Sequence, residues 1–263
     1  GFQIDLNTSF TGEDSLDIAI DSGSAAPNAS GVAMGFDTGT GLTVDGVTYT
    51  FPVGEATVVV GDSTDISATF TGACAYNAFT DHLGDCGTAN SLGVGGAGVT
   101  ATIGYAFDSG FSLAGGISSP QDAIMTEESA DLFALEAAYT ADTYGVALAY
   151  ASNDGAAADE TTYWGLNASY TPENTSFPSI SVGYETQDDG VDASGYFFGF
   201  TWSEVGPGSV SVGAGTQANY LDSETELLTY EASYSYAIND GMTITPGAYI
   251  SEGVGLDGAD DTG

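Results

Sequence analysis

The stretch that decides the fold reads LTYEASYSYAI and occupies residues 228–238. Its apolar and aromatic residues fall at every second position, and the residues between them are small, polar or acidic. Successive side chains of a β-strand point to opposite faces of the sheet, so this period of two predicts a strand with one apolar and one polar face. The run is eleven residues long, whereas strands of globular proteins usually have roughly five to six.

The same alternation recurs along the whole chain, for example in residues 2–7, 144–150 and 164–170. It predicts an all-β protein that forms a single domain over residues 1–263. The fourteen predicted strands are 1–10, 14–22, 42–53, 56–61, 97–108, 111–118, 130–141, 143–152, 161–171, 178–187, 193–204, 208–218, 225–238 and 242–252.

The connections between these strands alternate in length. Short turns lie at 11–13, 54–55, 109–110, 142, 172–177, 205–207 and 239–241, and longer segments lie at 23–41, 62–96, 119–129, 153–160, 188–192, 219–224 and from 253 onward. Outer-membrane barrels have this rhythm, because their periplasmic turns are short and their extracellular loops are long. The sequence therefore predicts a transmembrane antiparallel β-barrel. A soluble sandwich or barrel, in which the apolar face is the core, fits the same alternation and is the alternative.

Strand parity adds an expectation about the size of the barrel. Bacterial single-chain barrels have an even number of antiparallel strands. Here the first predicted strand leads into a short turn, and the last leads into a long segment. We therefore expect one further strand before residue 1 and one after residue 263, so that about 16 strands complete the barrel and about 14 belong to this chain.

The composition is acidic and lacks basic side chains. The 263 residues include 37 Asp and Glu, one His and neither Lys nor Arg, which gives a formal charge of −37. A surface without cations cannot neutralise phosphates, so nucleic acid is excluded as a partner. Hydrophobic residues make up 42% of the chain, which argues against disorder. Cys74 and Cys86 lie twelve residues apart and could form a single disulfide, which would indicate an oxidising compartment.

Several short motifs are similar to those of reactive sites. Asp37 and Asp261 each begin an Asp-Thr-Gly triplet, as in aspartic proteases, but neither lies in a predicted strand, so we expect no enzyme and no catalytic residue. His82 has no second His and no Cys pair at zinc spacing, so no metal site is predicted. Loop acids such as Asp188 and Asp189 could bind Ca²⁺ or Mg²⁺ loosely, and no other cofactor is expected.

Three segments resemble the cyanobacterial outer-membrane porins, a family related to the carbohydrate-selective porin superfamily. They read LNTSFTGED at 6–14, VTYTFPVG at 47–54 and YAINDGMTITPG at 236–247, and a Gly-rich segment at 93–98 accompanies them. The resemblance implies a homotrimeric channel for ions and small solutes, set in the lipid of a cyanobacterial outer membrane. It also implies an N-terminal peptidoglycan-associated domain, expected outside this chain, and a wall rich in Arg, which this chain lacks.

The longest connection, residues 62–96, contains both cysteines. Resemblance to porins implies that such a loop folds into the lumen and narrows it, and a disulfide would stabilise it by about 2–3 kcal/mol. The alternative is an external loop with solvated carboxylates, and the sequence leaves both open. The constriction candidates are Asp62, Asp65, Asp81, His82 and Asp85.

Acidic residues also fall on the polar face of the predicted strands. Unpaired acids in a water-filled lumen favour cations, so we predict a passive channel that prefers cations. A soluble acidic all-β surface or adhesion protein of the extracellular space is the alternative class. The pore-lining candidates are Asp5, Asp17, Asp21, Glu136, Glu185 and Glu231.

Overall fold

A computed structural model describes residues 2–22, 41–92, 98–121, 124, 126, 131–154, 160–188, 193–216 and 227–252. These residues form one antiparallel sheet of 15 strands, in which β1 to β14 follow one another in chain order and β15 pairs with β13. The strands are β1 (Phe2–Thr8), β2 (Ser15–Ser22), β3 (Thr43–Val53), β4 (Ala56–Asp62), β5 (Val99–Ala106), β6 (Phe111–Ser119), β7 (Asp131–Thr140), β8 (Tyr144–Asp154), β9 (Thr161–Tyr170), β10 (Ser179–Asp188), β11 (Ala193–Val205), β12 (Gly208–Thr216), β13 (Leu228–Asn239), β14 (Met242–Ile244) and β15 (Gly247–Ser251). The predicted all-β antiparallel fold is confirmed.

The first thirteen predicted strands are present to within three residues at either end. The fourteenth, residues 242–252, is wrong in one respect, because it is two strands, β14 and β15, which both pair with β13. Their register is continuous, since Tyr236 lies opposite Ile244 and Ser233 lies opposite Gly247. The interruption falls at Pro246, which has no N–H to donate to a ladder.

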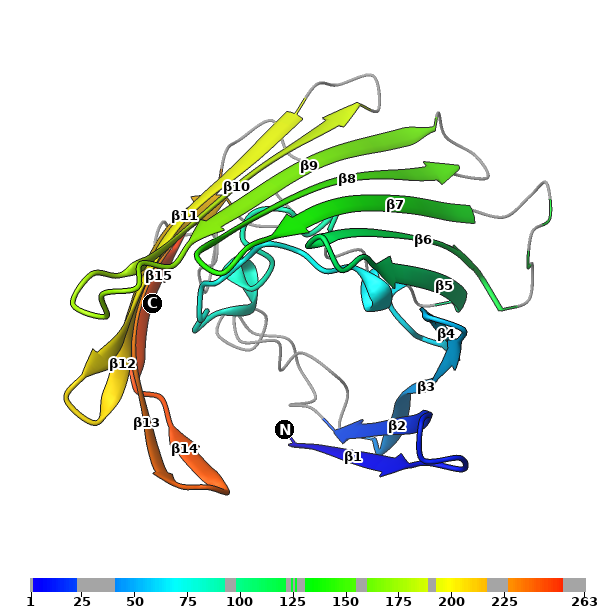
Figure 1. The fold of residues 1–263 in the computed structure, drawn as a ribbon, viewed down its shortest axis with the longest axis horizontal. Helices are drawn as coiled ribbons and strands as arrows, with labels where there is room; N and C mark the ends of the chain where they lie inside the picture. Colours follow the sequence, from blue (N-terminus) through cyan, green and yellow to red (C-terminus); the bar gives the residue numbers. More distant parts are fainter. Residues whose placement is uncertain are drawn as a thin grey trace.

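The sheet curls around a concave interior, and its edge strands β1 and β14 lie on the open side of the curve (Figure 1). Among the described residues β1 pairs only with β2, while β14 and β15 pair only with β13. The ladder therefore does not close within the described part of the chain. The two further strands expected outside residues 1–263 stay a prediction.

The two faces of the sheet differ as the alternation predicts, but the apolar face is the exposed one. On β8, Tyr144, Val146 and Leu148 are 47%, 40% and 46% exposed, whereas the intervening Ala147 and Ala149 are buried. The same contrast holds on β5, where Ile103 is exposed and Thr102 is buried. A β-sandwich would bury its apolar face, so the sandwich alternative does not describe this sheet.

The segment after β4 lies on the concave side of the sheet (Figure 1). It contains two short 3₁₀ helices, η1 (Ile66–Thr69) and η2 (Asp81–Leu83). We call residues 63–92 the inner loop. It packs against small residues of the wall: Ile66 contacts Ala134 and Ala151, and Leu83 lies in a cluster with Phe197. The hydrophobic contacts of the interior are thus formed between the loop and the wall.

Neither described helix is long or apolar enough to span a membrane.

Candidate functional site

Glycines on the inner face of the wall allow the inner loop to approach the backbone closely. A Cβ added to Gly165 on β9 would lie 1.8 Å from the Ser91 hydroxyl oxygen, and one added to Gly183 on β10 would lie 1.7 Å from the Cys86 carbonyl oxygen. A Cβ on Gly213 of β12 would come within 2.5 Å of the Tyr76 hydroxyl. Only glycine leaves room for the loop at these positions.

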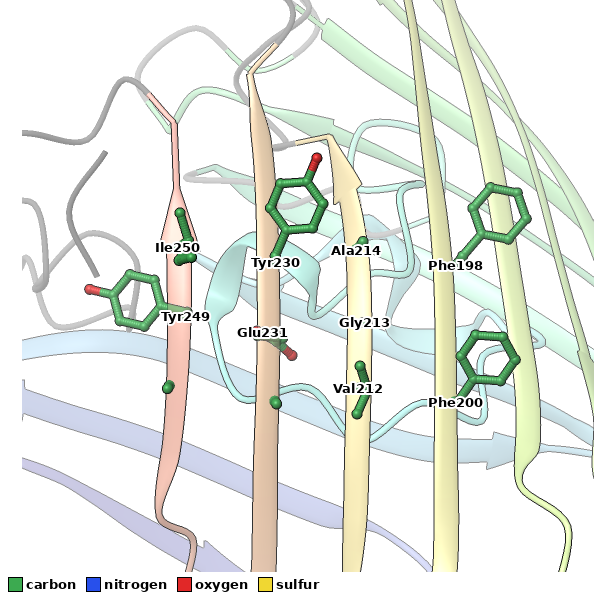
Figure 2. Close-up of a pocket in the computed structure, with 11 residues that line it drawn as sticks. Phe198, Phe200, Val212, Gly213, Ala214, Tyr230, Glu231, Tyr249 and Ile250 are labelled. Atoms are coloured by element: carbon green, nitrogen blue, oxygen red, sulfur yellow. The ribbon is translucent and has the colours of Figure 1, made fainter. Parts of the chain in front are cut away.

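Glu231 holds the middle of the inner loop. One of its carboxylate oxygens accepts hydrogen bonds from the Tyr76 hydroxyl at 2.9 Å and the Phe79 amide at 2.7 Å. The other accepts from the Thr80 amide at 2.8 Å and the Thr80 hydroxyl at 2.6 Å. Figure 2 shows Glu231 on the opposite side of β13 from Tyr230, toward the loop behind the sheet. Burial and the neighbouring carboxylate raise the pKa of the Tyr76 hydroxyl, so it remains a donor.

Glu136 on β7 holds the beginning of the inner loop. Its two carboxylate oxygens accept hydrogen bonds from the backbone amides of Thr71 and Gly72, at 2.7 and 2.9 Å. The Glu136 side chain is buried between strand and loop. It therefore lies on the predicted inner face but is covered by the loop.

Glu185 on β10 holds the end of the inner loop. The Asn90 side-chain amide donates to one carboxylate oxygen at 2.8 Å, and the Ser91 hydroxyl donates to the other at 2.6 Å. Glu185 is also buried. Three of the six pore-lining candidates thus contact the loop directly.

Neutral side chains of the wall make further contacts that the sequence did not predict. Asn167 on β9 accepts from the Ala73 amide at 2.7 Å, and Ser181 on β10 accepts from the Ala75 amide at 2.9 Å. The only sequence signal was their place on the inner face of their strands. Nothing in the local sequence shows which loop amide each would meet.

The predicted disulfide joins Cys74 to Cys86, with 6.1 Å between their Cα atoms. Cys86 is buried against Phe197, whereas Cys74 is exposed. Cys86 also has a positive φ of 51°, which L-residues seldom adopt. The bridge closes the central part of the loop over the wall.

His82 attaches the loop near the last strands of the sheet. Its Nδ1 lies 3.2 Å from the Thr229 hydroxyl on β13 and 3.0 Å from the Ser251 hydroxyl on β15. Burial lowers the pKa of the imidazole, although Asp81 and Glu231 act in the opposite direction. Burial thus favours the neutral form of the His82 imidazole.

The loop acids occupy two kinds of position. Asp65, Asp81 and Asp85 are exposed on the inner loop, whereas Asp62, at the end of β4, accepts two hydrogen bonds from the Gln121 amide. Asp85 borders a cavity of about 170 Å³ that Phe70 also lines. Although the residue is exposed as a whole, the protein around this cavity removes part of the hydration of its carboxyl group, and this loss together with repulsion from Asp81 and Asp65 raises the pKa of Asp85 to about 6.

The remaining pore-lining candidates lie on β1 and β2, on the far side of the concave interior from the loop (Figure 1). They accept hydrogen bonds from neutral donors: Asp5 from Gln3, Asp17 from Asn7 and Ser15, and Asp21 from Thr43. The chain holds no Lys or Arg that could pair with them. These carboxylates therefore have neutral hydrogen-bond partners and no ion pairs within the described residues.

No group of three or more His, Cys, Asp or Glu within the described ranges is arranged to hold a metal ion. Asp37, Asp189 and Asp261 lie outside the described residues.

The outer face carries a shallow apolar groove of about 410 Å³ over β11, β12, β13 and β15. Phe198, Phe200, Val212 and Ile250 line it, with Ala214 and Tyr230 between them (Figure 2). It belongs to the outward apolar surface and is separated from the interior by the sheet.

Comparison with solved structures identifies the fold. A triple variant of the porin of Rhodopseudomonas blastica has a TM-score of 0.58 at 15% identity, covering 98% of this chain and 85% of that one. A double variant of the same porin has a TM-score of 0.57 at 14% identity with the same coverage. No family model matches the chain, and no curated protein matches its sequence. At this identity the likeness shows the fold alone, which is that of a porin.

Proposed function

We propose that this chain is the wall of an outer-membrane porin, a passive water-filled channel for inorganic ions and small hydrophilic solutes. The observation that carries the proposal is the inverted arrangement of the sheet: apolar side chains are exposed on its outer face, and polar groups and a folded loop occupy its inner face. A lipid-facing band outside and a polar lumen inside are the requirements of a transmembrane barrel. The porin fold of the structural neighbours supports it.

We further propose that the channel prefers cations. Asp65, Asp81 and Asp85 on the loop and Asp5 and Asp17 on the strands present carboxylates toward the interior, while no Lys or Arg is available to oppose them. A lumen of one charge sign attracts counterions and repels ions of its own sign. Because salt screens charge over about 3 Å at 1 M but about 10 Å at 0.1 M, the preference should be strongest in dilute salt.

The remaining proposals come from the family resemblance and from strand parity. They comprise a homotrimer in outer-membrane lipid, a cyanobacterial origin, loosely bound Ca²⁺ or Mg²⁺ at loop acids, and no catalytic activity. They also include a peptidoglycan-associated domain and two closing strands outside residues 1–263. The unpaired edges of β1 and β14 support the closing strands, because an open edge in lipid would leave backbone groups without hydrogen bonds.

Reconstitution into planar bilayers tests the function. The expected result is stepwise conductance with a reversal potential of cation sign in a KCl gradient, larger at about 0.1 M than at about 1 M mean salt. A reversal potential of anion sign would contradict the cation preference.

Detergent dependence separates the porin from a soluble acidic surface or adhesion protein. The exposed apolar side chains of β5 to β13 should require detergent or lipid to stay dispersed. A chain that remained monodisperse in plain buffer would refute the porin proposal and favour the soluble alternative.

A further inference from the structure

We infer that Glu136, Glu185 and Glu231 are positioning residues that fix the inner loop and thereby set the dimensions of the pore. This inference rests on the proposed function for its link to permeation. It assigns the three glutamates a role other than attracting cations, even though they lie on the same face of the sheet as Asp5 and Asp17.

Burial is the first observation that separates the two groups of acids. Glu136, Glu185 and Glu231 are 3%, 2% and 4% exposed, whereas Asp5 is exposed and Asp17 is half-buried. A permeating ion would keep its hydration shell and would not reach a carboxylate covered by protein. The three glutamates are therefore poorly placed to act as charges of the lumen surface.

The second observation is that both oxygens of each buried carboxylate accept hydrogen bonds from the loop. Glu231 receives four of them, from Tyr76, Phe79 and Thr80. Hydrogen bonds to an ionised acceptor are about twice as strong as neutral ones. A buried carboxylate without such donors would be costly, so loop and glutamate each satisfy the other.

The third observation is how the contacts are distributed. The glutamates lie on β7, β10 and β13 and bind residues 71–72, 90–91 and 76–80. The beginning, middle and end of the loop are thus each fixed to a different strand. In a chain without Lys or Arg, amide and hydroxyl donors replace the ion pairs that could otherwise hold a loop to a wall.

The test compares Glu231→Gln with Asp17→Asn in the full chain. Each substitution removes one charge from the inner face, but only the first removes acceptors from the loop. In Glu231→Gln the amide nitrogen cannot accept, so one pair of donors loses its partner. Hydrogen exchange of residues 76–80 and single-channel recording are measured on both variants, with the wild type alongside.

The expected result for Glu231→Gln is amide exchange in residues 76–80 at least about tenfold faster, with local opening as the cause. Its single-channel current should fluctuate between several levels, because the released loop samples more than one position, while the reversal potential is unchanged. Asp17→Asn should shift the reversal potential and leave exchange and current levels as in the wild type.

The inference is overturned if Glu231→Gln behaves as Asp17→Asn does, shifting only the reversal potential. If Glu231→Gln does not fold, Glu136→Gln provides the same comparison at residues 71–72, where only one of the two backbone amides loses its acceptor. If the wild type forms no channel, the proposed function fails, but exchange still decides whether the glutamates fix the loop.

Discussion

Replacing Gly183 by alanine tests whether the inner loop lies directly on the wall. Gly183 is on the inner face of β10, and an added Cβ would lie 1.7 Å from the carbonyl oxygen of Cys86 and 2.9 Å from its carbonyl carbon. Loop and strand would have to separate by about 1.7 Å to restore an ordinary contact of 3.4 Å. The atoms involved are backbone, and the disulfide to Cys74 restrains them, so no side chain can turn away.

The cost of this separation follows from overpacking. An extra methyl group in a closely packed site usually destabilises a protein by about 1–3 kcal/mol. In an unconstrained strand the same change would stabilise by about 0.4–1 kcal/mol, because alanine reduces the freedom of the unfolded chain. Whether Gly183→Ala destabilises or stabilises the protein therefore indicates whether the loop packs against this glycine. Displacement of the loop toward the lumen should also lower the conductance.

Gly41→Ala is the matched control, because nothing lies within 4 Å of its added Cβ. Thermal unfolding in detergent and single-channel conductance are measured for both variants. We expect Gly183→Ala to unfold at a lower temperature and conduct less, with Gly41→Ala unchanged in conductance. If Gly183→Ala matched the wild type in both measurements, the loop would not lie on β10 and the site described above would be wrong.

Two further predictions concern the loop. Reduction of Cys74–Cys86 should remove about 2–3 kcal/mol of loop stability, seen as faster hydrogen exchange in residues 63–92 and unchanged exchange in the strands. Because the pKa of Asp85 is raised to about 6, its carboxyl group loses its charge as pH falls from 7 to 5. The cation preference should therefore weaken over that range, and Asp85→Asn should abolish this pH-dependent change in the reversal potential. The folded chain binds this proton more readily than the unfolded one, so this group should raise the stability of the protein as pH falls from about 6 toward about 4. Asp85→Asn should remove the corresponding increase in the unfolding temperature.

The strands could be predicted from the sequence because their signal is local. A period of two is visible within the ten or so residues of a single strand, and it also assigns Glu136 and Glu231 to the inner face without reference to their partners. The one error in the strand count arose because the alternation of apolar residues continues on both sides of Thr245 and Pro246, although the proline lacks an N–H for the ladder.

The site could not be predicted in the same way because its contacts are distant in sequence. Thr71 and Glu136 are 65 residues apart, and Phe79 and Glu231 are 152 apart. The loop has no periodic pattern to indicate the strand that each segment meets. Cys74 and Cys86 indicate only that the loop can be closed on itself, and either an internal or an external loop could contain such a bridge.

One sequence signal did carry information about the path of the loop. Gly165, Gly183 and Gly213 fall on the polar face of long strands, where glycine weakens a sheet unless another backbone approaches closely. Each of them faces a loop atom at a distance that would exclude a Cβ. Inner-face glycines on nearby strands therefore indicate where the loop crosses the wall.

Burial divides the acids of this chain into groups that the formal charge of −37 does not distinguish. Glu136, Glu185 and Glu231 are buried, and their carboxylates accept hydrogen bonds from donors of the loop and not from water or ions in the lumen. Asp65 and Asp81 are exposed on the same loop, and their charge remains available to ions in the lumen. The absence of Lys and Arg therefore acts twice: it leaves the exposed acids without opposing charge, and it makes the loop depend on amide and hydroxyl donors. A lysine introduced at Asp81 should consequently reduce the cation preference without releasing the loop, because no glutamate contact involves the Asp81 side chain.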